Sequence, residues 1–71
     1  MLYVLKIKGT KIIPDFVQIR DEQMTLRAYF RLSQQEIGLK KNNLEAEKKG
    51  IMALLKSIPY GKIHKYYSSN E

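Results

Sequence analysis

The 71-residue chain contains no cysteine and only one histidine. It can therefore form neither a disulfide nor a thiolate zinc site, and one histidine with scattered acids is too small a ligand set for a transition metal. No apolar run approaches the roughly 20 residues that cross a bilayer. Lys6 and Lys8 interrupt the apolar start, unlike a signal peptide. We expect no metal, no cofactor, no membrane partner and a cytoplasmic location.

Acidic residues are scarce. Seven Asp and Glu stand against thirteen Lys and Arg, which gives a formal net charge of +6. Residues 1–32 carry six bases and three acids, and residues 33–71 carry seven bases and four acids, so each half contributes +3. The chain has no basic tail. Such a charge favours association with polyanions but predicts neither fold nor specificity.

The clearest pattern is the alternation of apolar and polar residues between Phe16 and Leu32, which predicts a β-hairpin. The apolar face of its second strand is expected to hold Met24, Leu26, Ala28, Phe30 and Leu32. The polar face is expected to hold Thr25, Arg27, Tyr29 and Arg31. Because opposed residues share a face, the loop needs an even number of residues. A four-residue loop, Asp21–Met24, is favoured over Asp21-Glu22 alone, since neither of those two residues is Gly or Asn.

The flanking segments predict the remaining elements. Residues 1–8 alternate like a strand, Gly9-Thr10 reads as a turn, and Pro14 marks the entry to the hairpin. Ser33 to Glu36 matches a capping box and predicts a short helix. Asn42-Asn43 predicts a break and a new start, with a single bent helix as the alternative.

A longer helix is expected from about residue 43 to residue 57. Its apolar stripe would cover the hairpin and comprises Leu44, Ile51, Leu54, Leu55 and Ile58. Ile58 to Gly61 reads as a type I turn, and residues 62–67 as a last strand. The fold class is thus α+β: one domain, residues 1–67, with three or four antiparallel strands and helices on one face, in the order β-β-β-α-α-β. Residues 68–71 are expected to be a frayed tail.

The segment from Ile51 to Tyr66, IMALLKSIPYGKIHKY, resembles a helix and turn of the alkylguanine-DNA alkyltransferase family. That family depends on an active-site cysteine, which this chain lacks. The resemblance therefore implies the local turn structure and no catalytic activity.

The polar face of the hairpin is the candidate site. It would display Phe16, Arg20, Arg27, Tyr29 and Arg31, which include all three arginines of the chain. Rings that stack on bases and guanidinium groups that hold phosphates are typical of single-stranded RNA or DNA binding. The same residue types occur on an ordinary solvated strand face, where arginine stems cover apolar surface, and in protein interfaces.

An enzymatic alternative rests on His64. A histidine near Lys65, Tyr66 and Tyr67 could serve a metal-independent ribonuclease, but no second catalytic group lies at a fixed spacing. We therefore predict a non-catalytic binding module. Its partner is nucleic acid in the first hypothesis. In the second, the chain is a small regulatory or adaptor protein, with a homodimer as one form, whose first strand or hairpin edge pairs with another chain.

Overall fold

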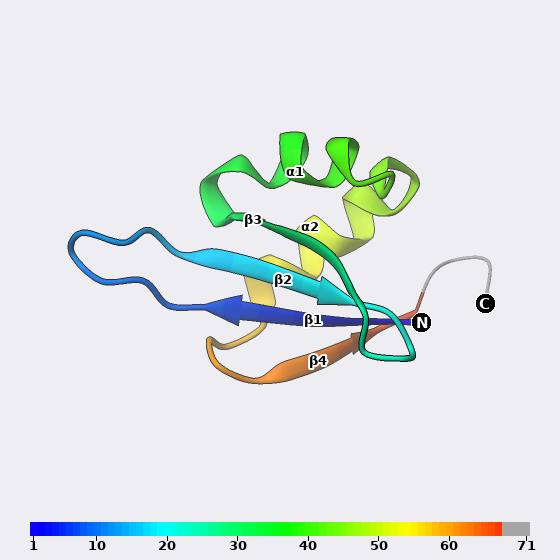
Figure 1. Ribbon diagram of the computed structural model, residues 1–71, viewed down its shortest axis with the longest axis horizontal. Coiled ribbons are helices and arrows are strands. Elements are labelled where there is room, and N and C mark those ends of the chain that lie inside the picture. Colours follow the sequence, from blue (N-terminus) through cyan, green and yellow to red (C-terminus); the bar gives the residue numbers. More distant parts are fainter. Residues whose placement is uncertain (68–71) are drawn as a thin grey trace.

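The computed structural model describes residues 1–67, and the tail expected at 68–71 lies outside them. Four strands, two α-helices and two short 3-10 turns follow one another (Figure 1). Their bounds are β1 Leu2–Ile7, β2 Phe16–Arg20, β3 Leu26–Arg31, η1 Leu32–Gln34, α1 Gln35–Lys41, η2 Glu45–Glu47, α2 Lys48–Ser57 and β4 Ile63–Tyr66. The predicted α+β class and the order β-β-β-α-α-β are confirmed.

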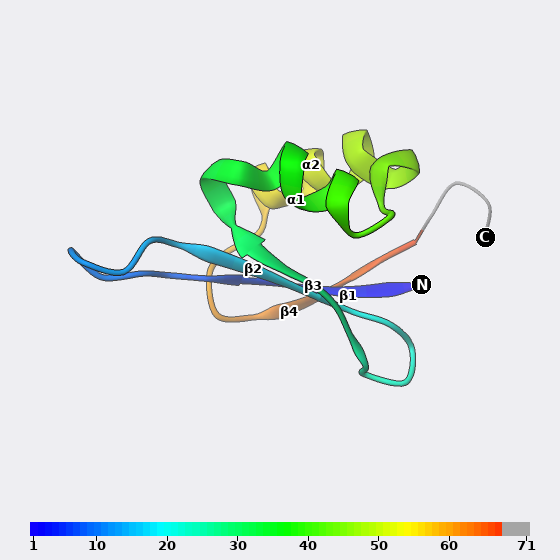
Figure 2. The same cartoon turned by 45° about the horizontal axis from the view of Figure 1, so that its top comes forward.

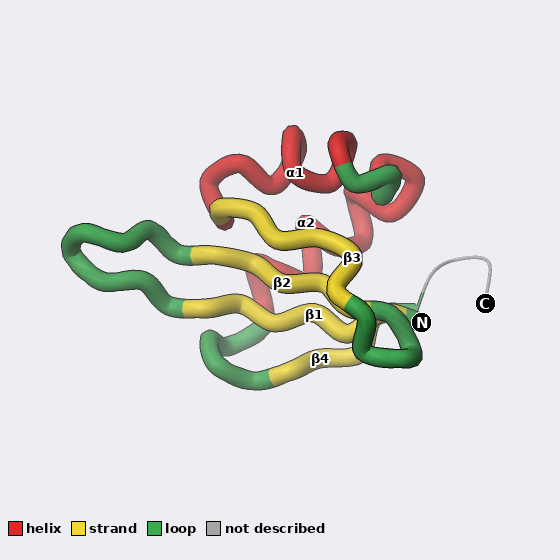
Figure 3. The backbone as a smooth tube through the Cα atoms, viewed as in Figure 1, coloured by secondary structure: helices red, strands yellow, loops and turns green. Residues whose placement is uncertain are grey.

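All four strands form one antiparallel sheet in the order β3-β2-β1-β4. Both α-helices lie against the same face of this sheet, and the other face is open (Figure 2 and Figure 3). β1 is a central strand because β2 and β4 pair with it on either side. The expectation that strand 1 pairs with another chain is therefore wrong, because its hydrogen-bonding groups are already used.

The core lies between the helices and the sheet. The predicted stripe of the second helix is confirmed, since four of its five residues are buried and Leu54 packs against them. Hydrophobic burial of this kind contributes about 25 cal/mol per Å² of apolar surface. The buried residues are Val4, Val17, Ile19, Ala28, Phe30, Leu39, Leu44, Ile51, Leu55 and Ile58.

Two glycines set how closely the helices approach the sheet. A Cβ atom at Gly38 would overlap the ring of Phe30, so α1 can lie on β3 only because residue 38 has no side chain. At Gly50 a Cβ atom would meet the hydroxyl end of Tyr66. Tyr66 lies in β4 and donates its hydroxyl proton to Glu47 over 2.8 Å. Glycine thus replaces a better helix former where the backbone packs against a ring.

The β2–β3 loop differs from the four-residue loop expected. The Asp21 N–H donates to Thr25 O over 3.0 Å and the Met24 N–H to Asp21 O over 2.9 Å, so the loop spans residues 21–25. Met24 takes a left-handed conformation with φ 65°. The register then shifts between Ile19 and Arg20, so that Ile19 opposes Ala28 while Arg20 opposes Leu26.

This bulge corrects the expected apolar face. Opposed residues share a face, so Leu26 joins Arg20 on the open side, and both Met24 and Leu26 are exposed. Ala28 and Phe30 are buried and Leu32 is half-buried, as expected. The strand alternation therefore holds from residue 28 onward and is lost at the bulge.

The helix boundaries also differ from those expected. Ser33 lies inside η1, and Gln34, not Ser33, precedes α1 without a side-chain cap, so no capping box forms. Asn43 ends α1 instead of starting α2. It has φ 60°, and the N–H groups of Asn43 and Leu44 donate to Lys40 O and Leu39 O. That pattern is a Schellman motif, in which asparagine tolerates the left-handed position.

Candidate functional site

The open side of the sheet, here called the outer face, is built by the strand register. Three rows of side chains cross it. Tyr3 lies between Lys65 and Arg20, Leu5 lies between Ile63 and Gln18, and Ile7 opposes Phe16, which in turn opposes Arg31. Gln18 also opposes Tyr29. Arg20, Arg31 and Lys65 therefore lie on the same face as Tyr3, Phe16 and Tyr29, and none of the residues in these rows is acidic.

The centre of the predicted site is a ring pair. The centroids of Phe16 and Tyr29 lie 4.9 Å apart, and their planes differ by 24°, which is a stacked arrangement. Tyr29 is 52% exposed, so one ring of the pair is open to a partner. Stacking fixes the orientation of both rings before a ligand binds. The two side chains therefore lose less conformational entropy on binding.

The three arginines have different surroundings. Arg20 donates to the carbonyl of Met24 over 2.9 Å, and the Arg27 guanidinium lies 3.9 Å from the Asp21 carboxylate. Both therefore also support the β2–β3 loop. Arg31 is exposed beside Phe16. The structure thus brings the predicted hairpin residues together, but Arg27, at the bulge, is oriented towards the loop.

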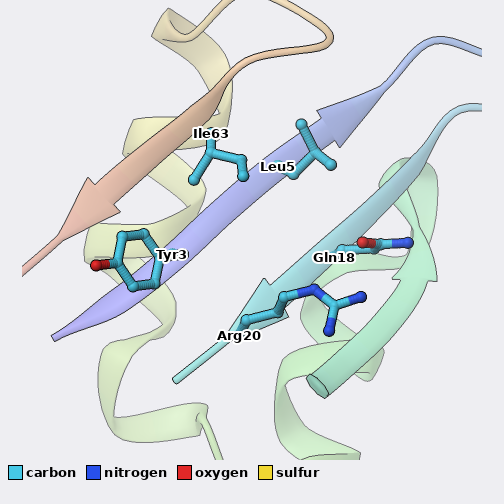
Figure 4. Close-up of a pocket in the computed structure, with 5 residues that line it drawn as sticks. All are labelled: Tyr3, Leu5, Gln18, Arg20 and Ile63. Atoms are coloured by element: carbon cyan, nitrogen blue, oxygen red, sulfur yellow. The ribbon is translucent and has the colours of Figure 1, made fainter. Parts of the chain in front are cut away.

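Sequence reasoning missed the part of the outer face that other strands supply. Figure 4 shows a shallow depression lined by Tyr3, Leu5, Gln18, Arg20 and Ile63. Its volume of about 10 Å³ corresponds to about one water molecule. The depression is therefore too small to bind a small-molecule ligand. The alternation of residues 1–8 already placed Tyr3 and Leu5 on one face, but only the strand order brings Ile63 and Lys65 beside them.

His64 lies on the opposite side of the sheet. It opposes Val4, a core residue, and its Nε2 atom is buried without a hydrogen-bond partner in the described residues. The side chains of Lys65 and His64 point to opposite faces because neighbours in a strand alternate. The structure therefore does not bring His64 together with the arginines of the outer face.

A second polar cluster forms where Tyr60 lies beside Lys6, in β1, and Lys8, just after it. The ammonium groups of Lys6 and Lys8 lie 4.5 Å and 4.9 Å from the centroid of the Tyr60 ring. The Tyr60 hydroxyl donates to Asp15 over 2.7 Å, and the Gly9 N–H donates to the other oxygen of that carboxylate over 2.7 Å.

These contacts shift two pKa values in opposite directions. The Gly9 N–H and then the Tyr60 hydroxyl hold the pKa of Asp15 below its usual value, and the charges of Lys8 and Lys6 add to this more weakly. Burial opposes the shift, with an effect larger than that of either lysine. The hydrogen bond to Asp15 raises the pKa of Tyr60. The pKa of Tyr66 is also raised, by burial first and then by its hydrogen bond to Glu47.

Comparison with models of known protein families, with curated proteins and with solved structures finds no match for this chain. Within residues 1–67, no group of three or more His, Cys, Asp or Glu side chains could hold a metal ion. No helix in the same range has the length and apolar character to span a membrane.

Proposed function

We propose that the outer face binds single-stranded RNA or DNA in the cytoplasm, without catalysis. The observation that carries this proposal is the stacked, half-open Phe16–Tyr29 pair on a strand face with several cations and no acid. One base stacks on Tyr29, and neighbouring phosphates contact Arg31, Arg20 and Lys65. An open antiparallel sheet is suited to this because flat rings and an extended strand lie on it side by side.

The test is a titration of fluorescently labelled single-stranded RNA and DNA at several salt concentrations. With these three phosphate contacts the slope of log K against log salt should be about −2, since each contact contributes about −0.7 for single strands. Tyr29→Ala should weaken binding by about 5- to 150-fold, the equivalent of about 1–3 kcal/mol of stacking. Arg31→Ala should reduce the steepness of the slope by about 0.7.

Lys56→Ala is the matched control, because Lys56 is an exposed cation in the last turn of α2, on the helical side. It removes one charge without changing the outer face. If binding is absent, does not depend on salt, or falls as much in Lys56→Ala as in Arg31→Ala, the outer face is not a nucleic-acid site.

The second candidate function is a regulatory or adaptor role through protein contacts, including a homodimer. It is favoured by the apolar share of the outer face, where Ile63 is exposed beside Leu5, and by the position of β3 and β4 at the two sheet edges among the described strands. Edge strands can pair with another chain. Light scattering distinguishes the two: a dimer that Ile63→Lys dissociates supports this role, and a monomer at every concentration removes the homodimer.

A further inference from the structure

The connection between β1 and β2, residues 8–15, is a hairpin arm that extends beyond the sheet (Figure 1 and Figure 2). At its end, Ile12 is 93% exposed and Ile13 is 55% exposed. Two neighbouring aliphatic side chains are thus presented to solvent at a projecting point of the molecule. Gly9-Thr10 alone was expected to make this turn, which would have been shorter.

Most of the backbone N–H groups of the arm tip, residues 9–14, already donate within the protein. Thr10 Oγ1 accepts from the N–H groups of Ile12 and Ile13 over 3.2 and 3.0 Å, and the Thr10 N–H donates to Ile13 O over 2.7 Å. The Gly9 N–H donates to Asp15, and Pro14 has no N–H. The cost of bringing these N–H groups into an apolar medium is therefore lowered, because they keep their partners.

Lys11 directly precedes Ile12 and Ile13, whereas Lys8 lies at the base of the arm with its ammonium group over the Tyr60 ring. No acidic residue occurs before Asp15. The Asp15 carboxylate is held at the base of the arm by Gly9 and Tyr60. An apolar tip with an adjacent lysine is complementary to a surface that is apolar inside and negatively charged outside.

We propose that the arm tip binds the surface of membranes that contain anionic lipids, with Ile12 and Ile13 inserted among the acyl chains and Lys11 against the headgroups. The expectation of no membrane partner is based on the absence of a membrane span and of a signal peptide, and a surface contact made by one loop needs neither. Nucleic acid fits the tip less well, because isoleucine can neither stack as a ring nor bond to phosphate. The proposed site is separate from the outer face and does not depend on its function.

The experiment measures co-sedimentation of the full chain with two kinds of vesicle: phosphatidylcholine alone, and phosphatidylcholine mixed with phosphatidylserine, whose headgroup gives the surface a negative potential. The native chain should bind the anionic vesicles more tightly. Ile12→Ser/Ile13→Ser should weaken that binding about a hundredfold or more, since a buried isoleucine contributes about 1.5–3 kcal/mol, equivalent to about tenfold or more for each of the two. Lys11→Glu should weaken vesicle binding several-fold, and only when phosphatidylserine is present.

Ile37→Ser is the matched control because Ile37 is 57% exposed on α1, away from the arm. Since the chain has no tryptophan, Ile12→Trp and Ile37→Trp serve as local reporters. Only the emission of Ile12→Trp should shift to the blue when anionic vesicles are added. Tyr29→Ala should bind vesicles normally, which separates this test from the nucleic-acid test.

Several results would overturn the proposal. These are no vesicle binding by the native chain, equal binding to neutral vesicles, equal loss in Ile37→Ser, or no blue shift at position 12. A tip that binds a protein and no vesicle would likewise show that its apolar partner is a protein pocket. Because both isoleucines are exposed, their replacement should leave the circular dichroism spectrum and the unfolding midpoint unchanged, so a loss of binding cannot be attributed to unfolding.

Discussion

Lys6 is a charged residue in the core, only 7% exposed. Its Nζ donates to the carbonyl oxygen of Leu55 over 2.8 Å, in the last turn of α2, and the Tyr60 ring lies 4.5 Å away. The last carbonyls of a helix have no partner within the helix and carry partial negative charge. Lys6 therefore acts as a side-chain cap that connects the central strand to the end of α2.

We predict that Lys6→Met lowers the free energy of unfolding by about 1–3 kcal/mol, because the buried Leu55 carbonyl loses its donor while the volume of the side chain is nearly kept. Urea denaturation checks this. Lys8→Met is the control, since Lys8 is exposed and contacts the same Tyr60 ring, and it should change stability by less than about 0.5 kcal/mol. A Lys6→Met variant of native or higher stability would mean that the cost of burying the ammonium offsets its hydrogen bond.

At the scale of single elements, the β2–β3 turn is fixed mainly by Asp21. Its side chain accepts from the N–H groups of Gln23 and Thr25, and its backbone bonds to Met24 and Thr25. This geometry requires a left-handed residue at position 24, where the chain has methionine with φ 65°. A left-handed conformation costs a residue with a Cβ atom roughly 1–2 kcal/mol.

Met24→Gly should therefore raise the free energy of unfolding by about 0.5–1 kcal/mol, because the relief of backbone strain exceeds the entropy that glycine adds to the unfolded chain. Met24 is exposed, so little burial is lost. Thermal and urea unfolding of Met24→Gly and Met24→Ala provide the measurement. Alanine keeps the Cβ atom and should give no gain; an equal gain in both variants would attribute the effect to the lost methionine side chain.

The same turn shows how far local pattern predicts structure. Alternation from Ala28 to Leu32 predicted the correct faces because each residue follows the strand period of two. The bulge at Arg27, between the pairs Ile19–Ala28 and Arg20–Leu26, was missed because no glycine marks it in the sequence. Asn43 was correctly identified as a boundary but assigned to the wrong helix, since asparagine serves both as an N-cap and as a left-handed C-terminal residue.

At the scale of the whole molecule, the outer face depends on strand order. The sequence predicted that Phe16, Tyr29 and Arg31 share a face, because they belong to one hairpin. It could not place Lys65 beside Tyr3, which needs β4 to return across α2 and pair with β1. Contacts between segments about 60 residues apart leave no local pattern, and these contacts determine which cations and rings meet.

Asp15 connects three distant parts of the fold: it binds Tyr60, which is 45 residues away, accepts from Gly9, and its carbonyl accepts from Leu32. A pKa held below the usual value means that the folded state binds the proton of Asp15 less tightly than the unfolded state. The stability it contributes is therefore fully present above the ordinary Asp pKa of about 3.9 and is lost as the pH falls through the lower folded value.

Asp15→Asn should thus be less stable than the native chain at pH 7, and the two urea midpoints should converge as the pH falls below about 4. Tyr60→Phe should show a smaller difference, because the Gly9 N–H, the larger cause of the shift, remains. Urea titrations from pH 7 down to pH 2 measure all three chains. If the native and Asp15→Asn midpoints run parallel over that range, the carboxylate charge does not hold the arm, β3 and the Tyr60 turn together, and Asp15 contributes only through contacts that asparagine also makes.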